Sequence, residues 1–159
     1  MPGITARAIT SNGLAVTTVG LGGTGLGNMY RAVDPQDAIA TVHAAYDRGI
    51  RYFDTAPVYG FGLSETRLGQ VVRTLPRDES VISSKIGYDL VPIPASELKP
   101  TLWDAPPAMR ADFDHSRDAV MRSIEGLAEA PRSRADRHGL DPRSRRGAAF
   151  RARRGPLSP

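Results

Sequence analysis

Two hydrophobic patterns alternate along residues 1–126 of this 159-residue chain. Short apolar runs cover residues 16–21, 51–54 and 80–85, and such runs are typical of buried strands when turn residues bound them. After each run comes a stretch in which apolar side chains recur at the spacing of one helix face. Strand and helix therefore alternate, and this order predicts a parallel sheet built from βαβ units.

The first predicted helix runs from Asp34 to Gly49. Aspartate is a favoured N-cap, and Pro35 behind it suits the first helical position. Gly49 ends the helix, because glycine readily adopts the left-handed conformation that follows many helices. The stripe that this helix is expected to bury consists of Ile39, Val42, His43 and Tyr46.

Polar side chains also mark the predicted starts of the other two helices. Ser64 is the expected N-cap of the second helix. Asp114 or Ser116 is the expected start of the third, which runs to Glu125. The second helix carries the apolar residues Leu68, Val71, Val72 and Leu75.

A β-hairpin is predicted ahead of these units. Residues 6–11 and 14–18 flank Asn12-Gly13, a pair that suits the two positive-φ positions of a type I′ turn. A leading hairpin followed by strand–helix units indicates an α/β fold, the N-terminal portion of a (β/α)8 TIM barrel. The predicted barrel is incomplete, because only three of its eight strands are found.

Chemically useful side chains follow two of the predicted strands. Asp54 ends the second strand, Tyr59 lies in the loop behind it, and Lys85 ends the third strand. Barrel enzymes keep their catalytic residues at these carboxyl ends. A tyrosine releases its proton at a pKa of about 10, which a nearby ammonium lowers, and a carboxylate can hold that ammonium in place. The three residues suit carbonyl reduction, although a loop tyrosine beside an ordinary salt bridge explains them equally well.

Motifs around these three residues distinguish the two interpretations. Residues 49–69 read G-I-R-Y-F-D-T-A-P-V-Y-G-F-G-L-S-E-T-R-L-G, which resembles the signature G-[FY]-R-x-x-D-T-A-x-x-Y-x-x-E-x-x-x-G of the aldo-keto reductase family. V-G-L-G-G-T at 19–24 and S-S-K-I-G at 83–87 look like that family's first-strand and third-strand motifs. Residues 101–104 and 113–125 resemble more narrowly its sugar and pyridoxal dehydrogenases, of the D-threo-aldose and L-fucose type.

The resemblance implies hydride transfer between a nicotinamide cofactor, NADP or NAD, and an aldehyde or aldose. Tyr59 would be the general acid in reduction and the base in oxidation. Lys85 would lower the pKa of Tyr59, and Asp54 would anchor Lys85. The histidine that orients the carbonyl in this family has no position in this chain.

The resemblance also implies binding residues. Tyr59 and Trp103 would contact the substrate, Trp103 from a proline-rich loop over residues 91–107 that a simple linker also explains. Glycines near the cofactor would allow its close approach to the backbone. The implied contacts of the nicotinamide end are Gly22, Gly23, Thr24 and Asp54.

The glycine run at residues 20–25 also matches the G-x-G-x-x-G pattern of Rossmann dinucleotide sites. That fingerprint needs a helix opening inside it and an acid about 20 residues further on. Here the helix begins only at Asp34, and the next strand ends at Asp54. The spacing therefore disfavours a Rossmann site.

Composition disfavours several other classes of protein. The chain has no cysteine, which argues against a disulfide framework and a thiolate metal site. Its histidines, His43, His115 and His138, lack the spacing of metal ligands, so no metal site is expected. No apolar run approaches the ~18 residues of a membrane helix, and the first residues do not resemble a signal peptide. We expect a cytoplasmic enzyme acting on a small molecule, with no nucleic-acid or membrane partner and an oligomeric state left open.

Residues 127–159 differ from the rest. They hold nine arginines and three acids, whereas residues 1–126 hold 12 Lys and Arg and 14 Asp and Glu. Read one base out of frame, allowed codons for this tail spell Ser-Leu-Lys-Arg-Leu-Gly-Leu-Glu-Arg-Ile-Asp-Met-Val-Leu-Ile-His-Asp-Pro-Asp-Glu, which looks like the family's third helix end and fourth strand. We interpret the tail as disordered and out of frame after Gly126, through a shift in the gene or its sequencing. The truncated chain is expected to fold poorly and to be inactive.

Two functions of other classes stay open. The basic tail favours a nucleic-acid-binding protein, although its arginines share no helical face and its single aromatic residue is Phe150. A non-catalytic pseudo-enzyme could use the open sheet edge for interaction. Salt-sensitive nucleic-acid binding would distinguish the first, and cooperative folding of a monodisperse product the second.

Overall fold

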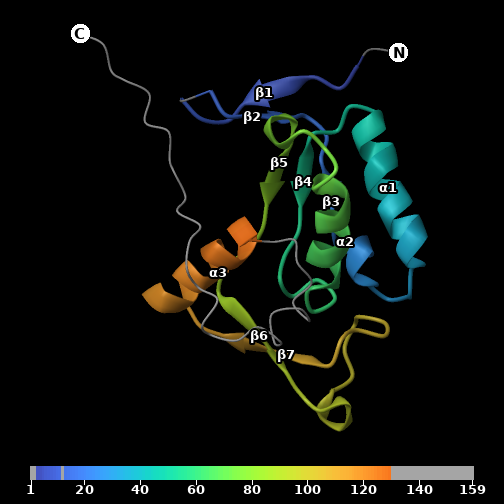
Figure 1. The fold of residues 1–159 in the computed structure, drawn as a ribbon, viewed down its shortest axis with the longest axis vertical. Coiled ribbons are helices and arrows are strands. Elements are labelled where there is room, and N and C mark those ends of the chain that lie inside the picture. The colour runs from blue at the N-terminus through green and yellow to red at the C-terminus, as the bar shows by residue number, and fades with distance from the viewer. Residues whose placement is uncertain (1–2, 12, 130–159) are drawn as a thin grey trace.

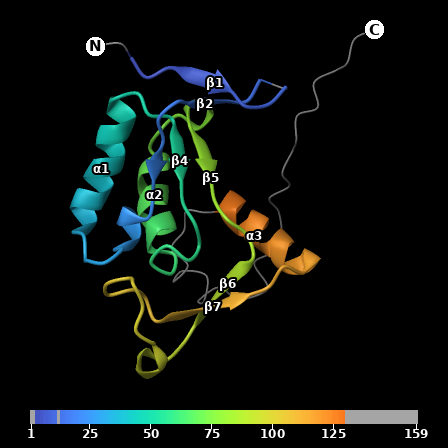
Figure 2. The ribbon, with the colours of Figure 1, turned by 180° about the vertical axis from the view of Figure 1, so that it is seen from behind.

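The computed structural model describes residues 3–11 and 13–129, which form three small sheets and three α-helices (Figure 1). A hairpin of β1 (Ala6–Ala8) and β2 (Ala15–Thr17) lies at one end. A second hairpin, formed by β6 and β7, lies at the opposite end, and Figure 2 shows the same order from behind. The parallel sheet with its two covering helices lies between the two hairpins.

The central sheet has the order β3-β4-β5 and is parallel throughout. Its strands are β3 (Leu21–Gly22), β4 (Tyr52–Asp54) and β5 (Val81–Ser83). In the middle strand, Phe53 pairs with Leu21 on one side and Ile82 on the other. The strands predicted over 51–54 and 80–85 are confirmed in shorter form.

The apolar run at 16–21, expected as one strand, is divided between two sheets. Its first part belongs to β2, and its last residue begins β3. The Thr17 hydroxyl donates to the Val19 carbonyl at 2.8 Å and accepts from the Arg51 amide at 3.1 Å. These bonds turn the chain between the strands and attach the hairpin to the amino end of β4.

Helix α1 (Pro35–Asp47) begins and ends where the sequence predicts. The Asp34 carboxylate accepts from the Gln36 amide at 2.7 Å, which satisfies a backbone donor at the helix start. Gly49 follows the helix with φ +92°, a conformation that suits glycine. The covered face is formed by Ala38, Val42 and Ala45, with Ile39 and Tyr46 partly buried beside them.

Helix α2 (Leu63–Val72) corrects one prediction, because Ser64 is not its N-cap. The cap is Gly62, whose φ of +90° turns the chain into the helix. Ser64 is fully buried in the first turn, and its hydroxyl donates to the Gly23 carbonyl at 2.7 Å. The serine therefore attaches the helix to the segment after β3.

The third helix, α3 (Arg117–Glu129), starts beside one of the two predicted residues. The Ser116 hydroxyl accepts from the Ala119 amide at 3.3 Å, as an N-capping side chain does. Arg122 contacts the Asp89 carboxylate of β6 at 2.8 Å, which joins the helix to the β6–β7 hairpin. Within the described residues, every helix is too short or too polar to cross a membrane.

The hydrophobic core lies between the sheet and its two covering helices. Phe53 of β4 is fully buried against Val42 of α1 and Val71 of α2, both also inaccessible to solvent. Burying one such side chain contributes about 1.5–3 kcal/mol. By contrast, Ile82 of β5, the edge strand of this sheet within the part described, is 37% exposed.

The N-terminal hairpin is confirmed, with a different turn from the one predicted. Ala8 pairs with Ala15, and the Ile9 amide donates to the Leu14 carbonyl at 2.8 Å. The connection is thus four residues long rather than two. Gly13 has φ +88°, whereas Asn12 lies outside the described residues.

The β6–β7 hairpin was not foreseen. Strand β6 (Tyr88–Pro92) pairs antiparallel with β7 (Met109–Phe113), where the sequence suggested only a proline-rich loop. The part of that loop at the hairpin tip carries a short 3-10 turn, η3 (Ala95–Glu97), and then Trp103. This hairpin lies beyond the carboxyl ends of β4 and β5, next to the candidate site (Figure 1).

Candidate active site

Asp54 and Lys85 meet at the carboxyl edge of the parallel sheet. Asp54 is the last residue of β4, and Lys85 lies two positions beyond the end of β5. The Lys85 ammonium donates to Asp54 Oδ2 at 2.5 Å and to the Thr55 carbonyl at 3.0 Å. Ser83, the β5 partner of Asp54, donates its hydroxyl to Asp54 Oδ1 at 2.5 Å. Both carboxylate oxygens therefore have donors, and the ammonium is held in one position.

The charges of this pair stabilise each other. Burial acts to raise the pKa of Asp54, but the hydrogen bonds from Lys85 and Ser83 outweigh it, so this pKa lies below its ordinary value. Burial acts to lower the pKa of Lys85, but the hydrogen bond and charge of Asp54, together with the Tyr59 hydroxyl, raise it above its ordinary value. Lysine and aspartate are therefore both ionised near neutral pH.

Tyr59 lies on the loop between β4 and α2, beside the ammonium. The Lys85 nitrogen is 5.3 Å from the centre of the Tyr59 ring. The loop is held by close backbone packing, because a Cβ on Gly27 would lie 2.7 Å from the Tyr59 carbonyl carbon. The fold thus brings together all three residues that the sequence predicts as catalytic.

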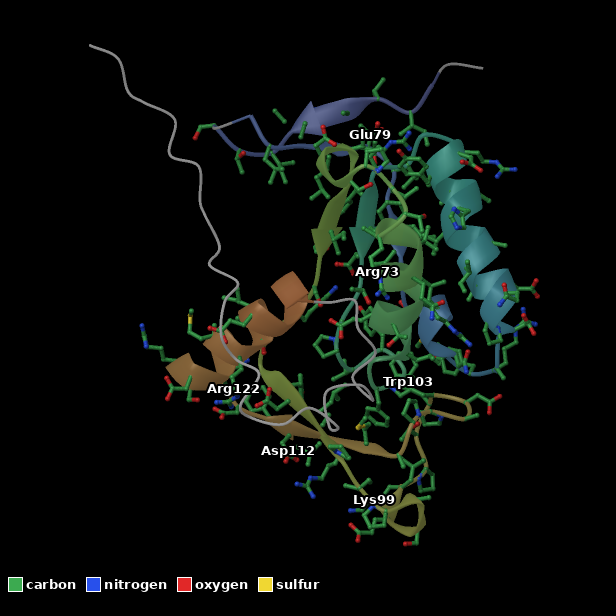
Figure 3. All side chains as sticks on the ribbon, viewed as in Figure 1. Arg73, Glu79, Lys99, Trp103, Asp112 and Arg122 are labelled. Carbon is green, nitrogen blue, oxygen red and sulfur yellow. The ribbon has the colours of Figure 1, made fainter. Side chains whose placement is uncertain are left out.

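Trp103 forms the neighbouring wall of the site. Its ring centre lies 5.8 Å from that of Tyr59, with an angle of 45° between the planes. A cavity of about 350 Å³ opens beside it, lined by Tyr30, Thr101, Leu102, Trp103 and Asp104. Figure 3 places Trp103 between the carboxyl end of the sheet and the β6–β7 hairpin.

The predicted cofactor residues differ in their surroundings. Gly22 pairs with Asp54 across the sheet, is exposed, and would place a Cβ in open space. Gly23 is buried, and a Cβ there would lie 2.8 Å from the Asp54 carbonyl oxygen. Close packing within the protein therefore accounts for a glycine at position 23, and Thr24, partly buried, follows it. Open space at Gly22 leaves its backbone accessible at the strand end.

Several residues that organise the site carry no sequence signal strong enough to find them. Ser83 sits within the recognised motif, yet its bond to Asp54 depends on strand register. Arg67 and Asn28 are both 5% exposed and are hydrogen-bonded to each other at 2.8 Å. Among the described residues no cluster of three or more metal-ligating side chains occurs.

Comparison with known proteins places this chain in a family. A model of the Aldo/keto reductase family matches residues 18–130. D-threo-aldose 1-dehydrogenase from Pseudomonas sp is 42% identical over 126 residues, covering 76% of this chain and 38% of its own length. Pyridoxal 4-dehydrogenase from Microbacterium luteolum is 41% identical over 128 residues, covering 75% of this chain and 37% of its own.

A solved structure supports the same assignment. The glycerol dehydrogenase of Gluconobacter oxydans superposes with a TM-score of 0.55 at 26% identity, covering 78% of this chain and 34% of that chain. The chain thus spans little more than a third of the relatives it matches. The expected fold is confirmed as the first portion of the (β/α)8 barrel of these relatives. The chain belongs to the aldo/keto reductase family.

Proposed function

We propose that Asp54, Tyr59 and Lys85 belong to the active site of a nicotinamide-linked oxidoreductase acting on an aldehyde or aldose. The observation that carries this proposal is the Lys85 ammonium, bonded to Asp54 at 2.5 Å and 5.3 Å from the Tyr59 ring centre. A phenol beside a fixed ammonium suits proton transfer to a carbonyl oxygen, since the cation stabilises the phenolate left behind.

The roles follow from these positions. Tyr59 donates its hydroxyl proton to the carbonyl oxygen in reduction and takes a proton from the alcohol in oxidation. Lys85 stabilises the phenolate, and Asp54 with Ser83 keeps the ammonium from swinging away. A bound nicotinamide, of NADP or NAD, would supply or accept the hydride.

The cofactor's ring would lie over the open strand end at Gly22, beside Asp54. Thr24 belongs to the same proposed contact, and so does Gly23 through its backbone. The cavity lined by Trp103 would take the substrate, and the Tyr59 ring lies against the indole, with ring centres 5.8 Å apart. A sugar-like aldehyde or aldose fits, because aromatic and hydroxyl side chains, those of Tyr30, Trp103 and Thr101, line this space.

The 159-residue polypeptide itself is proposed to lack turnover. The histidine and cofactor contacts expected from later barrel strands have no counterpart among the motifs found, and residues 127–159 are proposed to be out of frame. The proposed out-of-frame tail lies mostly outside the described residues, which end at 129. The activity is therefore testable in the product of a gene whose reading frame is restored after Gly126, the frame-restored enzyme.

The activity is tested by following nicotinamide absorbance with the frame-restored enzyme and L-fucose or similar aldoses. We expect turnover with NAD or NADP and none with the 159-residue chain under the same conditions. The absence of any aldose- or aldehyde-dependent absorbance change in the frame-restored enzyme would overturn the proposal. Substantial turnover by the 159-residue chain would instead overturn the proposed inactivity of the shorter product.

A further inference from the structure

Arg67 of α2 is a buried cation held by neutral acceptors. Its side chain is 5% exposed, and no salt bridge to it occurs within the described residues. Burial lowers the pKa of its guanidinium, against the opposing charge of Asp34. Burying a charge without a bonded counter-ion is costly, so its position calls for a structural reason.

The structural reason is the set of oxygen atoms that accept hydrogen bonds from the Arg67 guanidinium. Arg67 Nη1 donates to the Leu26 carbonyl at 2.8 Å and to Asn28 Oδ1 at 2.8 Å. Its Nη2 donates to the Val33 carbonyl at 2.9 Å. One guanidinium therefore fixes both ends of the loop between η1 (Gly25–Gly27) and α1.

Asn28 connects the Arg67 guanidinium to the loop that carries Trp103. Its backbone has φ +63°, and its Oδ1 also accepts from the Val33 amide at 3.1 Å. Its Nδ2 donates to the Asp104 carbonyl at 3.1 Å, and its carbonyl accepts from the Asp104 amide at 2.9 Å. The two loops, 76 residues apart, are thus joined through both backbone and side chain.

Asp104 completes the connection. Its carboxylate accepts from the Ala32 amide at 2.7 Å, and the Tyr30 amide donates to the Leu102 carbonyl at 2.8 Å. These bonds flank Trp103 on both sides. The η1 segment also packs on the peptide bond between Tyr59 and Gly60, because a Cβ on Gly27 would lie 2.8 Å from the Gly60 nitrogen. Both rings of the site are therefore positioned from residues 25–33.

We propose that Asn28, Arg67 and Asp104 form a loop clamp that positions Trp103 beside Tyr59. They are positioning residues, because none of them needs to touch the substrate to act. The role in substrate selection rests on the proposed function, whereas the placement of the indole does not. Loosening the loop clamp widens the cavity beside Trp103 and weakens the contact with the substrate.

The position of Trp103 is measurable without turnover, because it is the single tryptophan of the chain. We compare Asp104→Ala with Asp112→Ala, which removes a partly buried carboxylate from β7, where it contacts Arg110. Figure 3 labels Asp112 on the hairpin, away from Trp103. In the 159-residue chain, at a temperature where far-UV circular dichroism shows its helices, Asp104→Ala is expected to shift the fluorescence emission to the red and to raise acrylamide quenching, and Asp112→Ala to change neither.

Two further variants separate the bonds of the loop clamp. Asn28→Asp keeps an acceptor for Arg67 and Val33 but loses the donor to the Asp104 carbonyl, so it is expected to expose Trp103 while far-UV circular dichroism stays unchanged. Asp104→Asn keeps an oxygen for the Ala32 amide and is expected to restore wild-type fluorescence.

Three results would overturn the proposal: wild-type emission in both Asp104→Ala and Asn28→Asp; loss of helical signal in Asp104→Ala; or a wild-type Trp103 as quenchable as free tryptophan. In the frame-restored enzyme, Asp104→Ala is expected to raise KM for the aldose with kcat little changed, and a lower kcat at unchanged KM would contradict the assigned role. Because the fluorescence measurement needs no cofactor or substrate, it still tests the loop clamp when the proposed function is wrong.

Discussion

The Lys85 ammonium lies 2.5 Å from the Asp54 carboxylate, although the residues are far apart in the sequence: Asp54 ends β4, and Lys85 follows β5, the adjacent parallel strand. Their register is set by the pairing of Asp54 with Ser83, which itself bonds the carboxylate. The geometry thus depends on strand pairing, and the proposed acid–base chemistry depends on the geometry.

Substitutions of Lys85 and Asp54 are expected to lower kcat to different extents. In the frame-restored enzyme, Lys85→Met removes the cation beside Tyr59 and should lower kcat by about 10²–10⁴-fold, the range of acid–base contributions. Asp54→Asn should be milder, because the Thr55 carbonyl still accepts from the ammonium. Steady-state kinetics of both variants checks this, and an Asp54→Asn enzyme that is more impaired than Lys85→Met would contradict the order.

The same pair predicts a pH dependence of stability. The pKa of Asp54 is lowered in the fold, so its contribution is present above its unfolded pKa of about 4 and is lost as pH falls through the lower folded value. The pKa of Lys85 is raised, so its contribution is present below about pH 10 and is lost as pH rises through the folded value. The difference in unfolding free energy between wild-type and Asp54→Asn should therefore be largest between these limits. Denaturant titrations of the frame-restored enzyme at acidic, neutral and alkaline pH measure it, and a pH-independent difference would contradict the linkage.

Two glycines of the same short turn are expected to respond oppositely. An alanine Cβ at Gly27 would lie 2.7 Å from the Tyr59 carbonyl carbon, so Gly27→Ala must displace the tyrosine loop. At Gly25 a Cβ would meet nothing within 4 Å, so Gly25→Ala should be neutral or slightly stabilising. Thermal unfolding of the two variants, followed by circular dichroism, compares them. Equal melting temperatures would show that the backbone contact does not hold Tyr59.

The reading frame is tested by the nucleotides around the codons of Gly126 and Leu127. Removing one base there should open a frame of roughly another 180 residues, the remainder of a barrel of about 250 residues or somewhat more. An Ile-His-Asp-like strand should appear early in it. A stop codon soon after the correction would refute the out-of-frame tail.

Local signals in the sequence predicted α1 well, because its cap, first-turn proline and terminal glycine act within a few residues. The hairpin β6–β7 was missed, because the partners Pro92 and Met109 are far apart and its tip is rich in proline. Ser64 looked like a cap, but Gly62 takes that place by adopting a positive φ that only the fold requires.

In the candidate site, too, features with local sequence signals could be predicted, and features set by tertiary contacts could not. Asp54, Tyr59 and Lys85 could be predicted because residue type and strand position both indicate chemistry. Arg67 could not, since an arginine on a helix is usually solvated, and its acceptors here are carbonyls of a distant loop. Their position depends on tertiary packing, which no local pattern encodes.

The most direct test of the proposed acid–base site compares Tyr59→Phe with Tyr88→Phe in the frame-restored enzyme. Both changes remove one phenol oxygen; Tyr88 lies on β6, where its ring contacts Phe113 with centres 5.3 Å apart. Tyr59→Phe should lower kcat for aldose oxidation by about 10²–10⁴-fold, because the proton acceptor is gone, while Tyr88→Phe should keep kcat near the wild-type value. A Tyr59→Phe enzyme with near-normal kcat would contradict the account and place the acid–base group elsewhere.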